Sequence, residues 1–213
     1  MIPASRHQCF IYEGAPSKHL PALASVARQK LDLGFRCLYL NSPPMVAGMR
    51  SYLAALGVDI ELEIAKGSLL LSAEQSHLSA ERVFEIQRMI ETLESGIDQA
   101  VKDGYQGLWA SGDMSWELGP ERDFSRLVEY EWRLEELFRG RPELQGVCLY
   151  HADNLPREFL RKGLVVHPSL FVNETLSRIN PNYLAPESLT EAALASLDID
   201  SALQLLAASD GMG

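Results

Sequence analysis

A carboxylate and an aromatic side chain at the end of one predicted strand form the first candidate site. Asp113 and Trp116 lie in the loop 112–116, directly after the apolar run 107–111. An acid at this position suits a Walker-B-like role or a ligand-binding carboxylate, and a neighbouring aromatic ring suits a pocket for a small organic ligand. The alternatives are that Asp113 caps a turn or a helix and that Trp116 covers the edge of the sheet.

A second carboxylate, Glu131, falls on the apolar face of a predicted helix over 120–138. The buried stripe of this helix comprises Phe124, Leu127, Val128, Leu134 and Phe138, and Glu131 lies in its middle. A carboxylate there must be paired, protonated or facing a cavity. A different rotation of the helix would leave Glu131 at the edge of the stripe and bury Tyr130 or Trp132 instead. Glu131 and Asp113 could form an acid/base pair if they were within reach of each other.

The histidines show no metal-binding pattern along the chain. His167 follows the apolar run 164–166 and precedes Pro168, so we expect it to end a buried strand with its ring bonded to a neighbouring group, the alternative being a ligand role. The other four histidines show no metal-ligand spacing, either with one another or with the cysteines. They are His7, His19, His77 and His151. No catalytic Ser-His-Asp or Cys-His arrangement can be assigned, and the sequence contains no Gly-x-Ser-x-Gly motif. We therefore expect no metal, no cofactor and no catalytic residue.

The loop after the first strand lacks most of a phosphate-binding loop. It reads EGAPSKH over 13–19, and Gly14, Ser17 and Lys18 are what remains of such a loop. In a working loop, backbone N–H groups of several glycines hold the phosphates, and a Gly-Lys-Ser/Thr triplet follows. In this chain the triplet is absent, and Pro16 removes one backbone donor. A lone lysine after a loop glycine is ordinarily a solvated helix start. We expect no NTPase activity.

Short apolar runs alternate with amphipathic stretches, which predicts a three-layer α/β fold of the RecA-like kind. The sheet is expected to be mostly parallel, with helices on both faces. The predicted strands are 8–12, 35–40, 60–65, 68–72, 107–111, 146–151 and 164–168, of which 60–65 and 68–72 form a hairpin or paired edge strands. The first predicted helix ends at 33, and the second covers about 43–56. The third runs from an N-cap at Ser79 to about 101, and two more cover 120–138 and 156–161. Such sheets bind ligands at the carboxyl ends of their strands, here the loops after Tyr12, Asn41, Ser111 and Tyr150.

Length and composition suit one domain over 1–185 with an acidic helical appendage over 186–213. The chain has 213 residues, of which 46% are apolar. The appendage contains acidic residues but no Lys or Arg, and its leucines predict two short helices, the second N-capped by Asp200. It either packs on its own domain or serves as a partner-docking arm.

Charge and cysteine usage limit the partners and the compartment. The formal net charge is −10, without a basic run, which argues against direct nucleic-acid binding. No apolar run approaches the roughly 20 residues that span a bilayer, and the N-terminus lacks a signal-peptide pattern, so we expect a cytoplasmic protein without membrane contact. Cys9, Cys37 and Cys148 each lie in an apolar run, which is typical of reduced core thiols.

Six short segments, in order, resemble the MEDS domain, the sensory domain of methanogens and methylotrophs. They are 7–13, 112–116, 130–131, 147–150, 166–168 and 180–183. The resemblance spans about 7–185 and implies a RecA/KaiC relative without a working Walker A motif, which senses small molecules such as hydrocarbon derivatives. Such domains accompany DNA-binding, histidine-kinase or anti-sigma partners. The resemblance makes these residues pocket candidates: Tyr12, Asp113, Trp116, Glu131, Tyr150 and His167.

Three functions remain open from the sequence. The first is a non-catalytic sensory or regulatory module that binds a small organic ligand at the strand ends and communicates with a regulatory protein. That partner would be a kinase, a transcription factor or a protein of the anti-sigma type. A homo-oligomer is compatible with this function. The second is a degenerate RecA-like nucleotide-binding protein or ATPase that uses Lys18 and Asp113. The third is a ligand-free interaction module.

Overall fold

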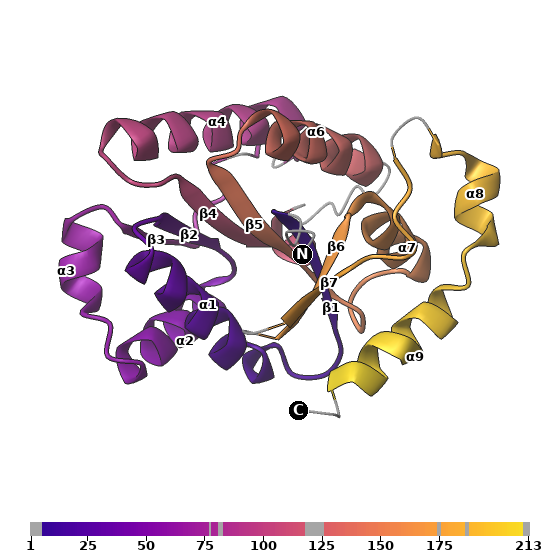
Figure 1. Ribbon diagram of the computed structural model, residues 1–213, viewed down its shortest axis with the longest axis horizontal. Coiled ribbons are helices and arrows are strands. Elements are labelled where there is room, and N and C mark those ends of the chain that lie inside the picture. Colours follow the sequence, from indigo (N-terminus) through magenta and orange to yellow (C-terminus); the bar gives the residue numbers. More distant parts are fainter. Residues whose placement is uncertain are drawn as a thin grey trace.

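The chain folds around one seven-stranded sheet with the strand order β3-β2-β4-β5-β1-β6-β7 (Figure 1). The computed structural model describes residues 6–76, 78–80, 83–117, 126–173, 176–185 and 188–210. The strands are β1 (His7–Tyr12), β2 (Arg36–Leu40), β3 (Leu69–Ser72), β4 (Leu108–Asp113), β5 (Leu144–His151), β6 (Ser169–Asn173) and β7 (Leu176–Ile179). All pairs are parallel except β6–β7, which is antiparallel. The expected mostly parallel α/β sheet is confirmed.

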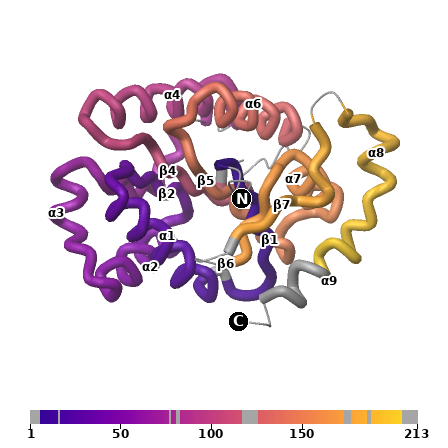
Figure 2. The backbone as a smooth tube through the Cα atoms, in the orientation of Figure 1, coloured from indigo at the N-terminus to yellow at the C-terminus, as the bar shows by residue number. Residues whose placement is uncertain are grey.

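Helices cover both faces of this sheet, as the three-layer prediction requires. The helices are η1 (Pro16–Lys18), α1 (Leu20–Asp32), α2 (Pro43–Ala55), α3 (Ile60–Ala65), α4 (Ile86–Lys102), α5 (Met114–Glu117), α6 (Leu127–Gly140), α7 (Arg157–Val166), α8 (Glu191–Ser196) and α9 (Ile199–Asp210). One hydrophobic core joins α1, α2 and α3 to the sheet, and a second joins α4, α6, α7 and α9 to its other face. Figure 2 shows β1 in the interior of the molecule, between the α1–α3 side and the α7–α9 side.

The alternation of β1 decides which of its side chains meet α6 and α7. Cys9 and Ile11 belong to the core of α4, α6 and α7, whereas Phe10 and Tyr12 belong to the opposite core. His7 is on the same side as Cys9, and its ring stacks on Phe138 of α6 with centroids 4.3 Å apart. The strand register therefore directs His7 toward α6.

Residues 60–65 form helix α3, so the predicted hairpin with 68–72 is wrong. The side chain of Asp59 accepts a hydrogen bond from the backbone N–H of Leu62 at 3.1 Å and caps the helix. Ile60 is buried, whereas Glu61 is exposed. Apolar and acidic residues alternate here as in a strand, but the N-cap supplies a helical start that the alternation does not show. Only β3 remains, as a parallel edge strand beside β2.

Ser79 does not cap the longest helix, which begins at Ile86 after an N-cap at Glu85. Its hydroxyl accepts from the N–H of Val83 at 3.2 Å, and its own N–H donates to the Val83 carbonyl at 2.9 Å. Ser79 therefore closes a loop before the helix. The expected stripe of α4 is buried at Ile86, Ile90, Leu93 and Ile97, whereas both of its predicted ends, Val83 and Val101, are exposed.

Residues 164–166 are helical, so the strand predicted over 164–168 is wrong. They complete α7, whose buried face follows helical spacing through Phe159, Leu160, Gly163 and Leu164. His167 is the C-cap of this helix, and the next strand begins at Ser169. The predicted helix over 120–138 is described from residue 126 onward, with an N-cap at Arg126 before α6, and its residues 120–125 lie outside the described residues.

The C-terminal appendage forms the two predicted helices, and α9 packs on its own domain. Ile199, Ala202 and Leu203 are buried in the core shared with α7, and Figure 1 shows α8 and α9 beside α7. The N-cap prediction for Asp200 is wrong, because Asp198 accepts from the N–H of Ser201 at 3.1 Å at the start of α9.

Two further predictions concern the thiols and the membrane. Cys9, Cys37 and Cys148 are buried free cysteines, as expected. In the described ranges, none of the helices has the length and apolar character needed to cross a bilayer.

Candidate functional site

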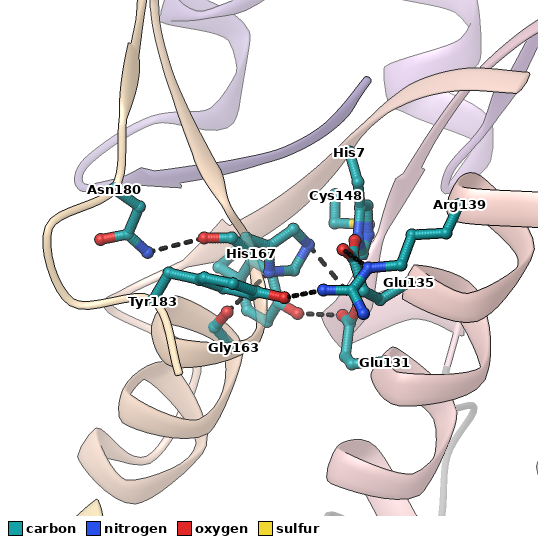
Figure 3. Close-up of polar contacts among 10 residues, drawn as sticks. His7, Glu131, Glu135, Arg139, Cys148, Gly163, His167, Asn180 and Tyr183 are labelled. Carbon is teal, nitrogen blue, oxygen red and sulfur yellow. Dashed lines mark hydrogen bonds and ion pairs between the residues drawn. The ribbon is translucent and has the colours of Figure 1, made fainter. Parts of the chain in front are cut away.

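Two histidines, a glutamate and a cysteine meet between the sheet and helices α6 and α7 (Figure 3). His7 begins β1, Cys148 lies in β5, Glu131 lies in α6, and His167 follows α7. All four side chains are buried, and their donor atoms lie within 4.8 Å of one another. We call these four residues the buried cluster.

Glu131 is the centre of the buried cluster. Its Oε2 lies 3.6 Å from Nε2 of His7 and 3.5 Å from Nε2 of His167. Its Oε1 accepts a hydrogen bond from the hydroxyl of Tyr150. Sγ of Cys148 lies 3.5 Å from Nε2 of His7. Within the described part of the chain, Glu131 Oε2 and His167 Nε2 have no hydrogen-bond partner. Two buried polar atoms without a bond, aimed at one point, are rare in folded proteins and need an explanation.

Contacts outside the buried cluster orient both imidazole rings. Nδ1 of His167 lies 2.6 Å from the carbonyl oxygen of Gly163, which can only accept, so this nitrogen carries the proton. Nδ1 of His7 lies 3.0 Å from Oε2 of Glu135, whose other oxygen accepts from Nε of Arg139 at 2.9 Å. An ionised Glu135 accepts from Nδ1–H of His7, and both rings then present the lone pair of Nε2 to Glu131.

The turn that carries His167 is fixed by close packing and by Asn180. Nδ2 of Asn180 donates to the backbone carbonyls of Leu164 and His167 at 2.6 and 2.8 Å. A Cβ at Gly163 would lie 2.5 Å from the ring of Tyr150, so only glycine lets α7 approach β5 this closely. These contacts bring the C-cap of α7 to the buried cluster.

Burial sets the protonation states of the buried cluster. It lowers the pKa of His7 to about 3 and lowers that of His167 well below its usual value. It raises the pKa of Glu131 to about 8, although the hydrogen bond from Tyr150 acts in the opposite direction. At neutral pH and without a bound cation, both rings are therefore neutral and Glu131 holds a proton.

The residues predicted at the strand ends form a separate group. The hydroxyl of Tyr12 donates to Oδ2 of Asp113 at 3.1 Å, and Oδ1 accepts from the N–H groups of Ser115 and Trp116 at 2.9 and 3.1 Å. Asp113 therefore caps α5, as the capping alternative predicts. Burial and the charge of Asp113 raise the pKa of Tyr12. The structure thus places Tyr12, Asp113 and Trp116 apart from the buried cluster, where Glu131 and His167 meet.

The loop after β1 is closed by another part of the chain. The N–H of Gly14 donates to Oδ2 of Asp153 at 2.7 Å, and Nε2 of His151 lies 2.8 Å from the Gly14 carbonyl oxygen. Ser17 and Lys18 are exposed. A carboxylate of the protein therefore occupies a backbone donor that a phosphate would need.

A small apolar cavity adjoins the buried cluster. It has a volume of about 30 Å³ and lies between β4, β5, α4 and α6. Its lining includes Met89, Leu93, Ala110, Met114, Leu134 and Cys148. Cys148 thus belongs both to the cavity and to the buried cluster.

The stretch that contains the four residues of the buried cluster matches a known sequence family. The model of the MEDS domain, the methanogen/methylotroph DcmR sensory domain, matches residues 6–168, which is most of the 213-residue chain. The chain belongs to the MEDS family. The matched range of this MEDS domain begins one residue before His7 and ends one residue after His167. A comparison with curated proteins gives no match.

Only part of the buried cluster of this MEDS domain was predictable from its sequence. Glu131 is fully buried, as its place in the helical stripe predicts, and Tyr150 and His167 lie beside it. His7 and Cys148 were missed because they are 141 residues apart and share no local spacing. The sequence signal that could have found them is the alternation of side chains along β1 and β5, which places both residues on the face of the sheet that α6 covers.

Proposed function

We propose that this MEDS domain is a non-catalytic sensory module that binds a small, weakly polar molecule in the cavity beside Cys148. The observation that carries this proposal is the sharing of Cys148 between an apolar cavity and a cluster of buried ionisable groups. Burying Glu131, His7 and His167 costs free energy that apolar side chains would not, and such groups concentrate at functional sites.

The dimensions of the cavity limit the ligand. Its volume of about 30 Å³ is about two to three times the roughly 10–15 Å³ of cavity space that a single water molecule needs, so a ligand has few non-hydrogen atoms. Met89 and Met114 line the cavity, and flexible methionines can repack around molecules of somewhat different shape. A halogenated or oxygenated one-carbon compound fits this description.

A strand-end site is the alternative position for the ligand. The carboxylate of Asp113 is already bonded to Tyr12 and to two backbone N–H groups, so a ligand there would have to replace contacts that cap α5. For this reason the cavity is the better candidate.

Methyl NMR of the full chain, titrated with dichloromethane and separately with methanol, tests the cavity. We expect shifts of the Met89 and Met114 methyl groups, and we expect Ala110→Val, which fills the cavity, to abolish them. Ala22→Val, a matched change in α1 on the other face, should leave them intact. Equal shifts in wild type and Ala110→Val would contradict the cavity site, and their loss only in Asp113→Ala would move the ligand to the strand ends.

A regulatory protein partner completes the proposal. Glu131 in α6 and His167 after α7 both belong to the buried cluster, so a ligand beside Cys148 can alter how these helices pack on the sheet. We propose that a kinase, a transcription factor or an anti-sigma type of protein detects that change, and that the protein acts in the cytoplasm, where buried free thiols stay reduced.

The nucleotide-binding alternative has less support. The Gly14 N–H is bonded to Asp153, and Lys18 is exposed in a loop with a single glycine. We expect calorimetry with Mg-ATP to give no heat of binding; binding that Lys18→Ala abolishes would restore this alternative.

A further inference from the structure

The spacing of the four donor atoms in the buried cluster resembles that of a tetrahedral metal site. Around zinc, nitrogen and oxygen ligands at about 2.0–2.2 Å and sulfur at about 2.3 Å lie roughly 3.3–3.6 Å from one another. The corresponding separations in this protein are 3.5 Å for His167–Glu131, 3.6 Å for His7–Glu131 and 3.5 Å for Cys148–His7. No pair exceeds 4.8 Å, so side-chain movements on the order of 1 Å would close the shell.

The contacts behind the histidines are those that metal ligands require. A metal-binding imidazole uses one nitrogen for the ion and donates the N–H of the other to a carboxylate or a carbonyl. His7 has Glu135 at 3.0 Å behind it, and His167 has the Gly163 carbonyl at 2.6 Å. The remaining nitrogens point inward, where Nε2 of His167 and Oε2 of Glu131 have no bond to the described residues.

Charge balance favours a divalent ion at this point. Two neutral imidazoles, one carboxylate and one thiolate carry a formal charge of −2, so an M²⁺ ion makes the buried centre neutral. Neutrality matters because the side chains are 0–7% exposed, and an unbalanced charge there is costly. Binding releases the thiol proton of Cys148 and the carboxyl proton of Glu131 to solvent.

We propose that His7, Glu131, Cys148 and His167 form a closed four-ligand site for a divalent transition-metal ion, with zinc the best match. The mixed nitrogen, oxygen and sulfur donors exclude Mg²⁺ and Ca²⁺, which take oxygen ligands. Since all four positions are filled by the protein, the ion has no open position for a substrate water, as in structural rather than catalytic zinc sites. The ion would tie α6 and the end of α7 to β1 and β5.

Titration of the chelator-stripped full chain with Co²⁺ alone tests this site. We expect one Co²⁺ per chain, the visible bands of tetrahedral Co²⁺, a thiolate-to-Co²⁺ charge-transfer band in the near ultraviolet, and loss of all of them when Zn²⁺ is added. Cys148→Ser should remove the charge-transfer band, whereas Cys37→Ser, a change at a buried thiol on the opposite face, should retain it.

A second variant separates ligation from folding. Glu135→Gln lies outside the ligand shell, and we expect it to weaken Co²⁺ binding about 10–100-fold while the tetrahedral spectrum is retained at saturation. The site is refuted if folded wild type, with its thiols reduced, takes up no Co²⁺, gives only the pale spectrum of octahedral Co²⁺, or keeps the charge-transfer band in Cys148→Ser.

The metal site and the small-molecule cavity can fail independently. The Co²⁺ titration contains no organic ligand, and Ala110→Val changes the cavity without removing a metal ligand. Retained Co²⁺ bands in Ala110→Val support the metal site whatever that variant does to the dichloromethane response. Loss of the bands in folded Ala110→Val would contradict a site built from these four ligands alone.

Discussion

Replacement of Glu131 by Gln in chelator-treated protein tests the electrostatics of the buried cluster. Gln has nearly the shape of a protonated Glu but cannot ionise, so the variant isolates the titration of one carboxyl. The titratable groups that face this carboxyl come from every element packed around it. They are His7 and Cys9 in β1, Cys148 and Tyr150 in β5, Glu135 in α6, and His167 after α7.

The direction of the effect follows from the pKa values in the folded and unfolded states. Burial raises the pKa of Glu131 from 4.5 to about 8, so between these values the folded protein holds a proton that the unfolded chain has released. Stability therefore falls as pH rises, by about 1.4 kcal/mol per pH unit and about 5 kcal/mol over the whole range.

The histidines act in the opposite direction but at lower pH. The pKa of His7 falls from 6.5 to about 3, and that of His167 is also lowered, so below pH 6.5 the unfolded chain binds protons that the folded protein does not. Stability contributed by the neutral rings is lost as pH falls below 6.5. From pH 6.5 to 8, the rings of the folded protein stay neutral and those of the unfolded chain lose only about half a proton each, so the Glu131 carboxyl dominates and lowers the stability by about 2 kcal/mol.

Urea unfolding at pH 6.5 and pH 8, followed by circular dichroism in the presence of a chelator, measures this difference. From the lower to the higher pH, Glu131→Gln should gain about 2 kcal/mol relative to wild type, because all other titrations cancel in the comparison. Glu136→Gln makes the same chemical change at an exposed position of α6 and should follow wild type. A Glu131→Gln variant that keeps the wild-type pH dependence would refute the buried, protonated carboxyl.

The packing around the buried cluster and the docking of α9 give further predictions, each measured by urea unfolding. Gly163→Ala should lower the free energy of unfolding by about 1–3 kcal/mol, because the new Cβ would lie 2.5 Å from the Tyr150 ring; an unchanged stability would contradict this close packing. Asn180→Ala should cost about 2–4 kcal/mol, since two buried carbonyls lose their donor, whereas a loss below 1 kcal/mol would show that the turn does not depend on it. Leu203→Ala should lower the free energy of unfolding by about 2–4 kcal/mol if α9 belongs to the core. Asp200→Asn removes only a surface ion pair and should lower it by less than about 1 kcal/mol. Equal effects of the two changes would contradict the docking of α9.

The layered fold was predictable because its signals are local. The apolar runs that became β1, β2, β4 and β5 lie between amphipathic helices, and the stripe of α6 correctly buried Glu131. The prediction for 60–65 failed because its apolar and acidic residues alternate as in a strand, while the decisive contact is the single hydrogen bond that caps the helix at Asp59. Capping and periodicity compete over such short segments, and periodicity alone does not decide between them.

The buried cluster was predictable only in part, because it is a product of tertiary structure. Each of its four residues comes from a different element, so no spacing along the chain reveals it. Glu131 stood out as a charge among apolar residues, whereas His7 and Cys148 resembled ordinary strand residues. Their meeting depends on the β1–β5 register, in which Cys9 pairs with Cys148, and on the close approach of α7 at Gly163.

The central position of β1 has a consequence for synthesis on the ribosome. β1 precedes the other described strands of this sheet along the chain, yet its neighbours in the sheet are β5 and β6, which are made much later. Its two edges therefore lack their native partners until residues 144–173 have emerged, and until then the ring of His7 also lacks Cys148 and His167. Native pairing of such distant segments is slow, so until then the β1 segment of the nascent chain is open to chaperones and to dissolved ions.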